Sequence, residues 1–142
     1  MTTIPESALD FVKTRAEREW RLTHSRDFLS RLFRFLLRKR PVDVIYVEQY
    51  GAGDWASGRC QGKAVGAWKL DTQGFAAIDA VGELDRSSPI ATATPVIRFH
   101  VDDPPLRMIY EEWHGGRAGY GAILRFDRSA NAWQTERMAW RS

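Results

Sequence analysis

The hydrophobic residues of this chain change their spacing at Pro41, and this change constrains the fold more than any other feature. Before Pro41 they recur every three to four residues, as on one side of a helix. After Pro41 apolar and polar residues alternate in short runs rich in Val, Ile, Tyr and Trp, which is typical of β-strands. We therefore expect helices first and a sheet afterwards.

Two helices are expected before Pro41. In the first, apolar side chains recur every four residues from Ala8 to Trp20, and Pro5 suits the first turn. The stretch THS at residues 23–25 can end this helix and cap the next one. The second helix ends at Pro41 and carries an apolar stripe made of Phe28, Leu29, Leu32, Phe33 and Leu36.

The remainder of the chain predicts about seven to eight short strands separated by turn residues. No helical pattern follows residue 41, so a parallel pair with a helical crossover is not expected, and we predict a largely antiparallel meander. The runs interpreted as strands are VDVIYVEQY, WASGRCQG, KAVGAWKL, GFAAIDAVGEL, VIRFHV, LRMIYEEW, YGAILRF and AWQTERMAW.

Glycines inside these runs indicate bulges and bends, so the sheet should be curved. They are Gly58, Gly62, Gly66, Gly82 and Gly121. The prediction is a single α+β domain over residues 1–142. Two helices in residues 1–41 pack on a curved sheet in residues 42–142, which is cone-like or closes into a small barrel.

This element order resembles the cone-shaped nuclear-transport-factor-2-like fold, with helices first, a curved antiparallel sheet next and a final strand over WQTERMAW. The resemblance is confined to element order and includes no residue motif. The long third helix of that fold has no counterpart in this sequence. Because the fold hosts enzymes, ligand binders and association modules, the resemblance implies no particular function.

Positive charge is concentrated in the helical segment. Residues 1–41 hold ten Lys and Arg against five Asp and Glu, a net +5, whereas residues 42–142 hold eleven against thirteen, a net −2. A segregated basic segment is compatible with a partner protein, a membrane surface or nucleic acid. The second helix is thus expected to be basic and amphipathic.

Composition excludes several classes of protein. Cys60 is the only cysteine, so an internal disulfide and a CxxC metal framework are both excluded. The N-terminus lacks the basic and apolar regions of a secretion signal, and no apolar run approaches the roughly 18 residues of a membrane span. We therefore expect a cytoplasmic protein, bacterial in character, that does not cross a membrane.

The densest group of polar residues lies in FHVDDPPLRMIYEEWHGG, residues 99–116. Matching the apolar faces of this hairpin pairs Phe99 with Met108 across a two-residue turn and places His100 beside Arg107. In that register His100 and Asp102 point away from Glu112 and His114. Four such side chains cannot converge on one ion from two faces of a sheet. We expect no metal site and no cofactor.

Three sets of residues are candidates for the functional site. A binding face on the second helix comprises Arg31, Arg34 and Arg38. A binding face on the sheet comprises Arg98, Arg107 and Trp113. If the protein is an enzyme or a ligand carrier, the expected rim of its pocket comprises Tyr110, Glu112, His114 and Tyr120.

The sequence lacks a catalytic motif, so it favours a small non-enzymatic binding protein, an accessory or immunity-type partner of another protein. One alternative is a small pocket enzyme or ligand carrier that uses the Glu/His/Tyr rim. Another is a nucleic-acid binder that uses the basic helix, which a steep dependence of binding on salt would reveal. Homo-oligomerisation is compatible with each of them.

Overall fold

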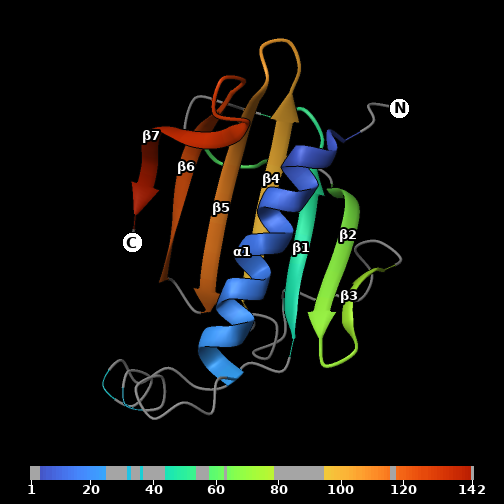
Figure 1. The fold of residues 1–142 in the computed structure, drawn as a ribbon. Helices are drawn as coiled ribbons and strands as arrows, with labels where there is room; N and C mark the ends of the chain where they lie inside the picture. Colours follow the sequence, from blue (N-terminus) through green and yellow to red (C-terminus); the bar gives the residue numbers. More distant parts are fainter. Residues whose placement is uncertain are drawn as a thin grey trace.

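In the computed structural model a helix lies across one face of a curved sheet (Figure 1). The structure describes residues 4–24, 44–53, 58–62, 64–78, 95–115 and 118–141, together with the exposed Leu32 and Leu36. These residues form one helix and seven strands. Apart from those two leucines, the second predicted helix and its candidate arginines, Arg31, Arg34 and Arg38, lie outside the described residues.

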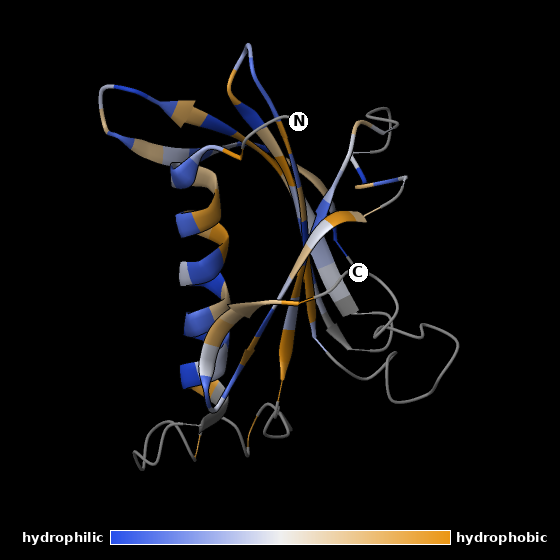
Figure 2. Ribbon diagram, turned by 90° about the vertical axis from the view of Figure 1, so that its right-hand side faces the viewer, coloured by the Kyte–Doolittle hydropathy of each residue, from blue (hydrophilic) through white to orange (hydrophobic). Residues whose placement is uncertain are grey.

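The helix α1 (Glu6–His24) forms where the four-residue spacing predicts it. The carbonyl oxygen of Pro5 accepts hydrogen bonds from the amides of Ala8 and Leu9, and the acidic Glu6 in the first turn suits the helix dipole. Ala8, Val12 and Ala16 are completely buried against the sheet. Figure 2 shows the same division, with the hydrophobic side of α1 facing the sheet and its hydrophilic side facing away.

The sheet has the strand order β3-β2-β1-β4-β5-β6-β7. Its strands are β1 (Ile45–Tyr50), β2 (Ala64–Asp71), β3 (Gly74–Ala77), β4 (Val96–Asp102), β5 (Arg107–Gly115), β6 (Ala118–Asp127) and β7 (Ala132–Arg141). Because β3 and β7 are edges, the described sheet is open. The closed barrel considered from the sequence is therefore not found.

The strand pairing is not wholly antiparallel, which corrects the predicted meander. Strands β1 and β4 pair in parallel at the centre of the sheet, with Glu48 opposite Arg98. They join two antiparallel units, β1 to β3 and β4 to β7. The alternation of apolar and polar residues within a strand does not indicate which distant strand it pairs with. The sequence pattern therefore did not predict this parallel pairing. The run WASGRCQG also forms no strand in its described part, residues 58–62.

The hairpin of β4 and β5 has the predicted faces but a different register. Phe99 pairs with Tyr110 and His100 pairs with Ile109, so the predicted partners Met108 and Arg107 were each wrong by two residues. The turn spans four residues, 103–106, because two consecutive prolines lack the amide hydrogens that a tighter ladder requires. A shift of two residues preserves the face of every side chain.

Candidate functional site

A row of charged and aromatic positions crosses five strands on the face of the sheet opposite α1. Register partners in adjacent strands are Glu48 on β1, Arg98 on β4, Glu111 on β5, Gly121 on β6 and Trp140 on β7. Directly opposed residues in a sheet point to the same side, so these positions share one face. The row places an arginine between two glutamates and an aromatic ring at the sheet edge.

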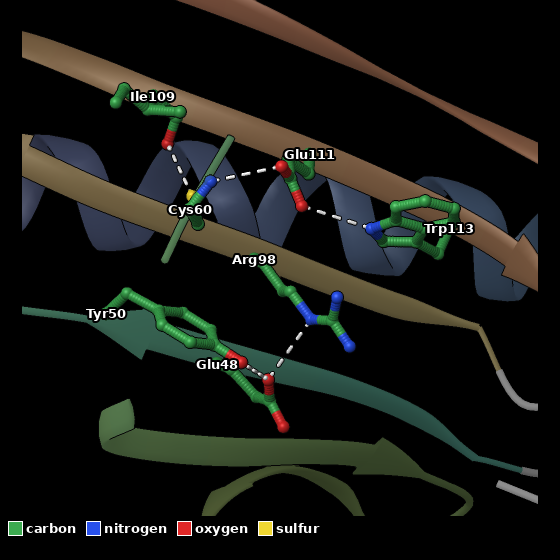
Figure 3. A network of polar contacts seen from close by, with 7 residues as sticks. All are labelled: Glu48, Tyr50, Cys60, Arg98, Ile109, Glu111 and Trp113. Atoms are coloured by element: carbon green, nitrogen blue, oxygen red, sulfur yellow. Dashed lines mark hydrogen bonds and ion pairs between the residues drawn. The ribbon is translucent and has the colours of Figure 1, made fainter. Parts of the chain in front are cut away.

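Glu111 is buried, with 2% of its surface exposed, and both of its carboxylate oxygens accept hydrogen bonds (Figure 3). The backbone amide of Cys60 donates to Oε1 at 3.0 Å, and the indole Nε1 of Trp113 donates to Oε2 at 3.1 Å. Glu111 therefore holds the segment around Cys60 against the sheet and fixes the Trp113 ring.

Glu48 is the second buried carboxylate of the row. Its Oε2 accepts hydrogen bonds from the hydroxyl of Tyr50 at 2.7 Å and from Nε of Arg98 at 3.3 Å. The side chain of Arg98 retains 20% of its exposure, and its two Nη atoms make no hydrogen bond within the described part of the chain (Figure 3). The guanidinium is thus fixed through Nε, while its outer donors stay available.

Two tryptophans pack against each other beside this row, with their ring planes tilted by 38°, because the intervening strand carries glycines. The ring centroids of Trp113 and Trp140 lie 4.6 Å apart. Trp140 belongs to β7 and Trp113 to β5, so the Trp140 indole must cross β6. A Cβ atom at Gly121 would overlap that indole, and one at Gly119 would press on both it and the β5 backbone. The glycines are therefore required for the contact between the two indoles.

An arginine lies over each indole. The guanidinium of Arg98 is 6.0 Å from the ring centroid of Trp113, and that of Arg59 is 5.7 Å from the centroid of Trp140. Both distances are within the range of cation–π attraction. We call these four residues, Arg59, Arg98, Trp113 and Trp140, the tryptophan–arginine face.

His100 lies on the same side of the sheet, nearer the β4–β5 turn. Its Nδ1 is 2.8 Å from the carbonyl oxygen of Tyr50, and its Nε2 is 3.1 Å from Oδ1 of Asp102. Both partners are acceptors, so only the protonated ring donates to both at once. His100 therefore links β4 to the end of β1.

Cys60 packs against β5, where its backbone amide contacts Glu111 and its thiol contacts Ile109. Its Sγ is 3.7 Å from the carbonyl oxygen of Ile109, to which it can donate. Burial, followed by the negative charge of Glu111, raises the pKa of the Cys60 thiol far above its usual value. A raised pKa disfavours the thiolate that nucleophilic chemistry requires.

The opposite face holds a buried carboxylate–tyrosine cluster beneath α1. The hydroxyl of Tyr110 donates a hydrogen bond to Glu112, and the ring of Tyr110 packs edge-on against Phe11. Tyr120 lies opposite Glu112 on β6, with its ring centroid 6.2 Å from that of Tyr110. Burial, then the charge of Glu112, raises the pKa of Tyr110 above its usual value and that of Tyr120 to about 12. Both hydroxyls remain protonated at neutral pH and stabilise the carboxylate.

The predicted site residues are only partly brought together. Tyr110, Glu112 and Tyr120 meet, but with Tyr110 and Glu112 buried under the helix, and the side chain of His114 lies outside the described residues. His100 and Glu112 face opposite sides, as predicted from the alternation. In the described part of the chain no group of three or more His, Cys, Asp or Glu is arranged to hold a metal ion.

The three residues of the predicted binding face on the sheet lie in two separate places. Arg98 and Trp113 are in contact, but Arg107 lies six residues from Trp113 along β5, about 20 Å, and forms an ion pair with Glu136 at 3.2 Å. Sequence reasoning placed Glu111 on this face beside Arg98 and Trp113 but missed Glu48, Arg59 and Trp140. The alternate glycines Gly119 and Gly121 were the available signal, because they mark a strand that another side chain crosses.

Two open pockets lie elsewhere. A groove of about 650 Å³ runs between the β4–β5 and β6–β7 turns and is lined by Pro105, Arg125 and Gln134, among others. A smaller pocket of about 320 Å³ lies between α1 and the β6–β7 hairpin. Neither is lined by Glu111, Glu112 or Arg98.

Neither a protein-family model nor a curated protein nor a solved structure matches this chain. Among the described residues, none of the helices has the length and apolar character needed to cross a membrane.

Proposed function

We propose that the protein is a small binding protein without enzymatic activity, an accessory or immunity-type partner of another protein. The tryptophan–arginine face is the contact surface. The observation that carries this proposal is the packed pair Trp113–Trp140 with a guanidinium over each ring. Tryptophan and arginine are the side chains that most often dominate the binding energy of protein interfaces.

The rigidity of this face supports the proposal. Trp113 is fixed by Glu111, Arg98 is fixed by Glu48, and Trp140 is positioned over Gly121. Side chains already held in place lose little conformational entropy on binding, which favours affinity. The unused Nη donors of Arg98 and the exposed Arg59 supply hydrogen bonds to a partner's carbonyl or carboxylate oxygens.

A protein partner fits this face better than nucleic acid does. Arginine and tryptophan together also suit single-stranded nucleic acid, through phosphate contacts and base stacking. However, Glu48 and Glu111 stand on either side of Arg98 in the same row, and their negative charges repel phosphates. The net charge of this row is therefore too small for binding driven mainly by phosphate contacts.

The test compares two charge-matched variants of the full chain, Arg59→Glu and Arg125→Glu. Both residues are exposed, so neither change should affect folding. Arg125 lies four residues from Gly121 on β6, about 13 Å away. A protein from the source cells that crosslinks to the native chain would be purified, and its affinity measured by calorimetry.

We expect Arg59→Glu to weaken the complex about tenfold or more and Arg125→Glu to change it less than about twofold. If both variants weakened the complex equally, the tryptophan–arginine face would not be part of the interface. A steep loss of affinity for single-stranded oligonucleotides with added salt would favour nucleic acid instead. If Glu112→Gln abolished the biological activity while Arg59→Glu left it intact, the enzyme alternative would replace the binding protein.

A further inference from the structure

The pocket of about 320 Å³ between α1 and the β6–β7 hairpin is separate from the tryptophan–arginine face, which lies on the other side of the sheet. Part of its wall is a stripe of α1 formed by Ser7, Phe11 and Thr14, positions that share one side of a helix. The other wall comes from Phe126 and Trp133.

The interior of this pocket is aromatic. The rings of Phe126 and Trp133 meet edge-to-face with centroids 5.3 Å apart, and Phe11 stands across from them on the helix. All three rings remain partly exposed, although each also packs on the protein. Rings that the fold does not fully cover bind an apolar ligand body favourably, because its burial removes apolar surface from water.

One cation borders the pocket. The guanidinium of Arg15 lies 5.4 Å over the ring of Phe11 and makes no hydrogen bond or ion pair among the residues that the structure describes. Its N–H donors form a planar fork that matches a carboxylate. The N–H donors of Arg15 are therefore available to an anionic group that lies beside the aromatic surface of Phe11.

Asp10 is the acidic residue of the lining, and its position directs the charge of a ligand. Asp10 and Arg15 are five residues apart on α1, about 140° around the helix and about 7.5 Å along it. They consequently border opposite sides of the stripe. Asp10 is the more exposed of the two, so its charge is more strongly screened and an anionic group is drawn to the Arg15 side.

We propose that this pocket binds a small organic carboxylate with an aromatic or similarly sized apolar body. The apolar body lies among Phe11, Phe126 and Trp133, and the carboxylate accepts hydrogen bonds from Arg15. The volume is at the lower end of the range of about 300–1,000 Å³ for small-molecule sites, so it suits a ligand of amino-acid size and excludes a nucleotide.

The test titrates the full chain with three probes that share one apolar body: 3-phenylpropionate, 3-phenylpropan-1-ol and 3-phenylpropylamine. Binding is followed through the indole N–H resonance of Trp133 in a ¹H–¹⁵N spectrum, assigned with Trp133→Phe. We expect saturable shifts with the carboxylate, binding about tenfold weaker for the alcohol, and weaker still for the amine.

Arg15→Gln should lower the affinity for 3-phenylpropionate to that of the alcohol and leave the alcohol unchanged. Arg18→Gln is the matched control, because Arg18 is exposed on the same helix and does not line the pocket. The proposal is overturned if the wild-type chain shows no saturable shift up to about 10 mM, or if it binds the alcohol or the amine as well as the carboxylate. The three probes on the wild-type chain decide this even if Arg15→Gln does not fold.

Discussion

Glu111 and Glu112 are adjacent in the sequence, yet they occupy opposite faces of the sheet and differ in every partner. Glu111 accepts hydrogen bonds from two N–H groups, whereas Glu112 accepts one from the hydroxyl of Tyr110 and lies opposite Tyr120. Both are at most 5% exposed. Two neighbouring carboxylates thus stabilise two separate layers, the segment around Cys60 on one side and the packing beneath α1 on the other.

The difference between these two sites lies in what surrounds them. Glu112 is enclosed by tyrosines and by the helix, so its contacts are internal. Glu111 is continuous with a partly exposed surface, because Trp113 contacts Trp140 and the Nη atoms of Arg98 make no hydrogen bond to the described residues. A buried carboxylate therefore marks a binding surface only where the side chains that it positions reach solvent.

The largest expected effect comes from changing each glutamate to glutamine. At Glu111 both partners are N–H donors, so the new amide NH₂ group faces a donor, and we expect a loss of about 2–3 kcal/mol in the free energy of unfolding. At Glu112 the hydroxyl of Tyr110 can rotate and accept, so Glu112→Gln should lose only about 1 kcal/mol. Urea unfolding followed by circular dichroism measures the loss of unfolding free energy in both variants. Equal losses would contradict the expected difference between Glu111 and Glu112.

Gly121→Ala should have the next largest effect and act only on the Glu111 side. The added methyl group displaces the Trp140 indole, and we expect a loss of about 1–3 kcal/mol in unfolding free energy. The control is a double-mutant cycle with Trp140→Ala, in which Gly121→Ala should change stability by less than about 0.5 kcal/mol. If Gly121→Ala destabilised the Trp140→Ala variant as much as it destabilises the native chain, its effect would not arise from displacing the Trp140 indole.

The smallest effect is a pH dependence on the Glu112 side. An unfolded tyrosine loses its proton near pH 10, whereas burial and then Glu112 raise the pKa of Tyr120 to about 12. Between those values the unfolded state binds fewer protons, so stability is complete below pH 10 and falls as the pH rises to 12. Screening at the partly exposed ring limits the loss to roughly 1 kcal/mol.

Thermal melts between pH 9 and 12 would measure this loss of stability. Tyr120→Phe should make the decline with pH shallower, while Tyr46→Phe, on β1, serves as the control. A decline unchanged by Tyr120→Phe would place its origin elsewhere in the chain.

The sequence alone determined the local structure and the separation of faces. Four-residue spacing from Ala8 to Trp20 predicted α1, and alternation placed His100 and Glu112 on opposite sides even though the hairpin register was wrong by two residues. Both features depend only on neighbours within one helix or strand. The single α+β architecture follows from them, because an apolar helix stripe and an apolar sheet face bury each other.

Only the tertiary structure decided which strands meet and which side chains gather. The parallel pair of β1 and β4 places Glu48 beside Arg98, and β6 supplies the glycines over which Trp140 reaches Trp113. Arg107 was grouped with Trp113 from sequence because both lie on one face, but distance along β5 separates them. Pairing between distant strands depends on the packing of the whole chain, which the period of a single strand does not contain.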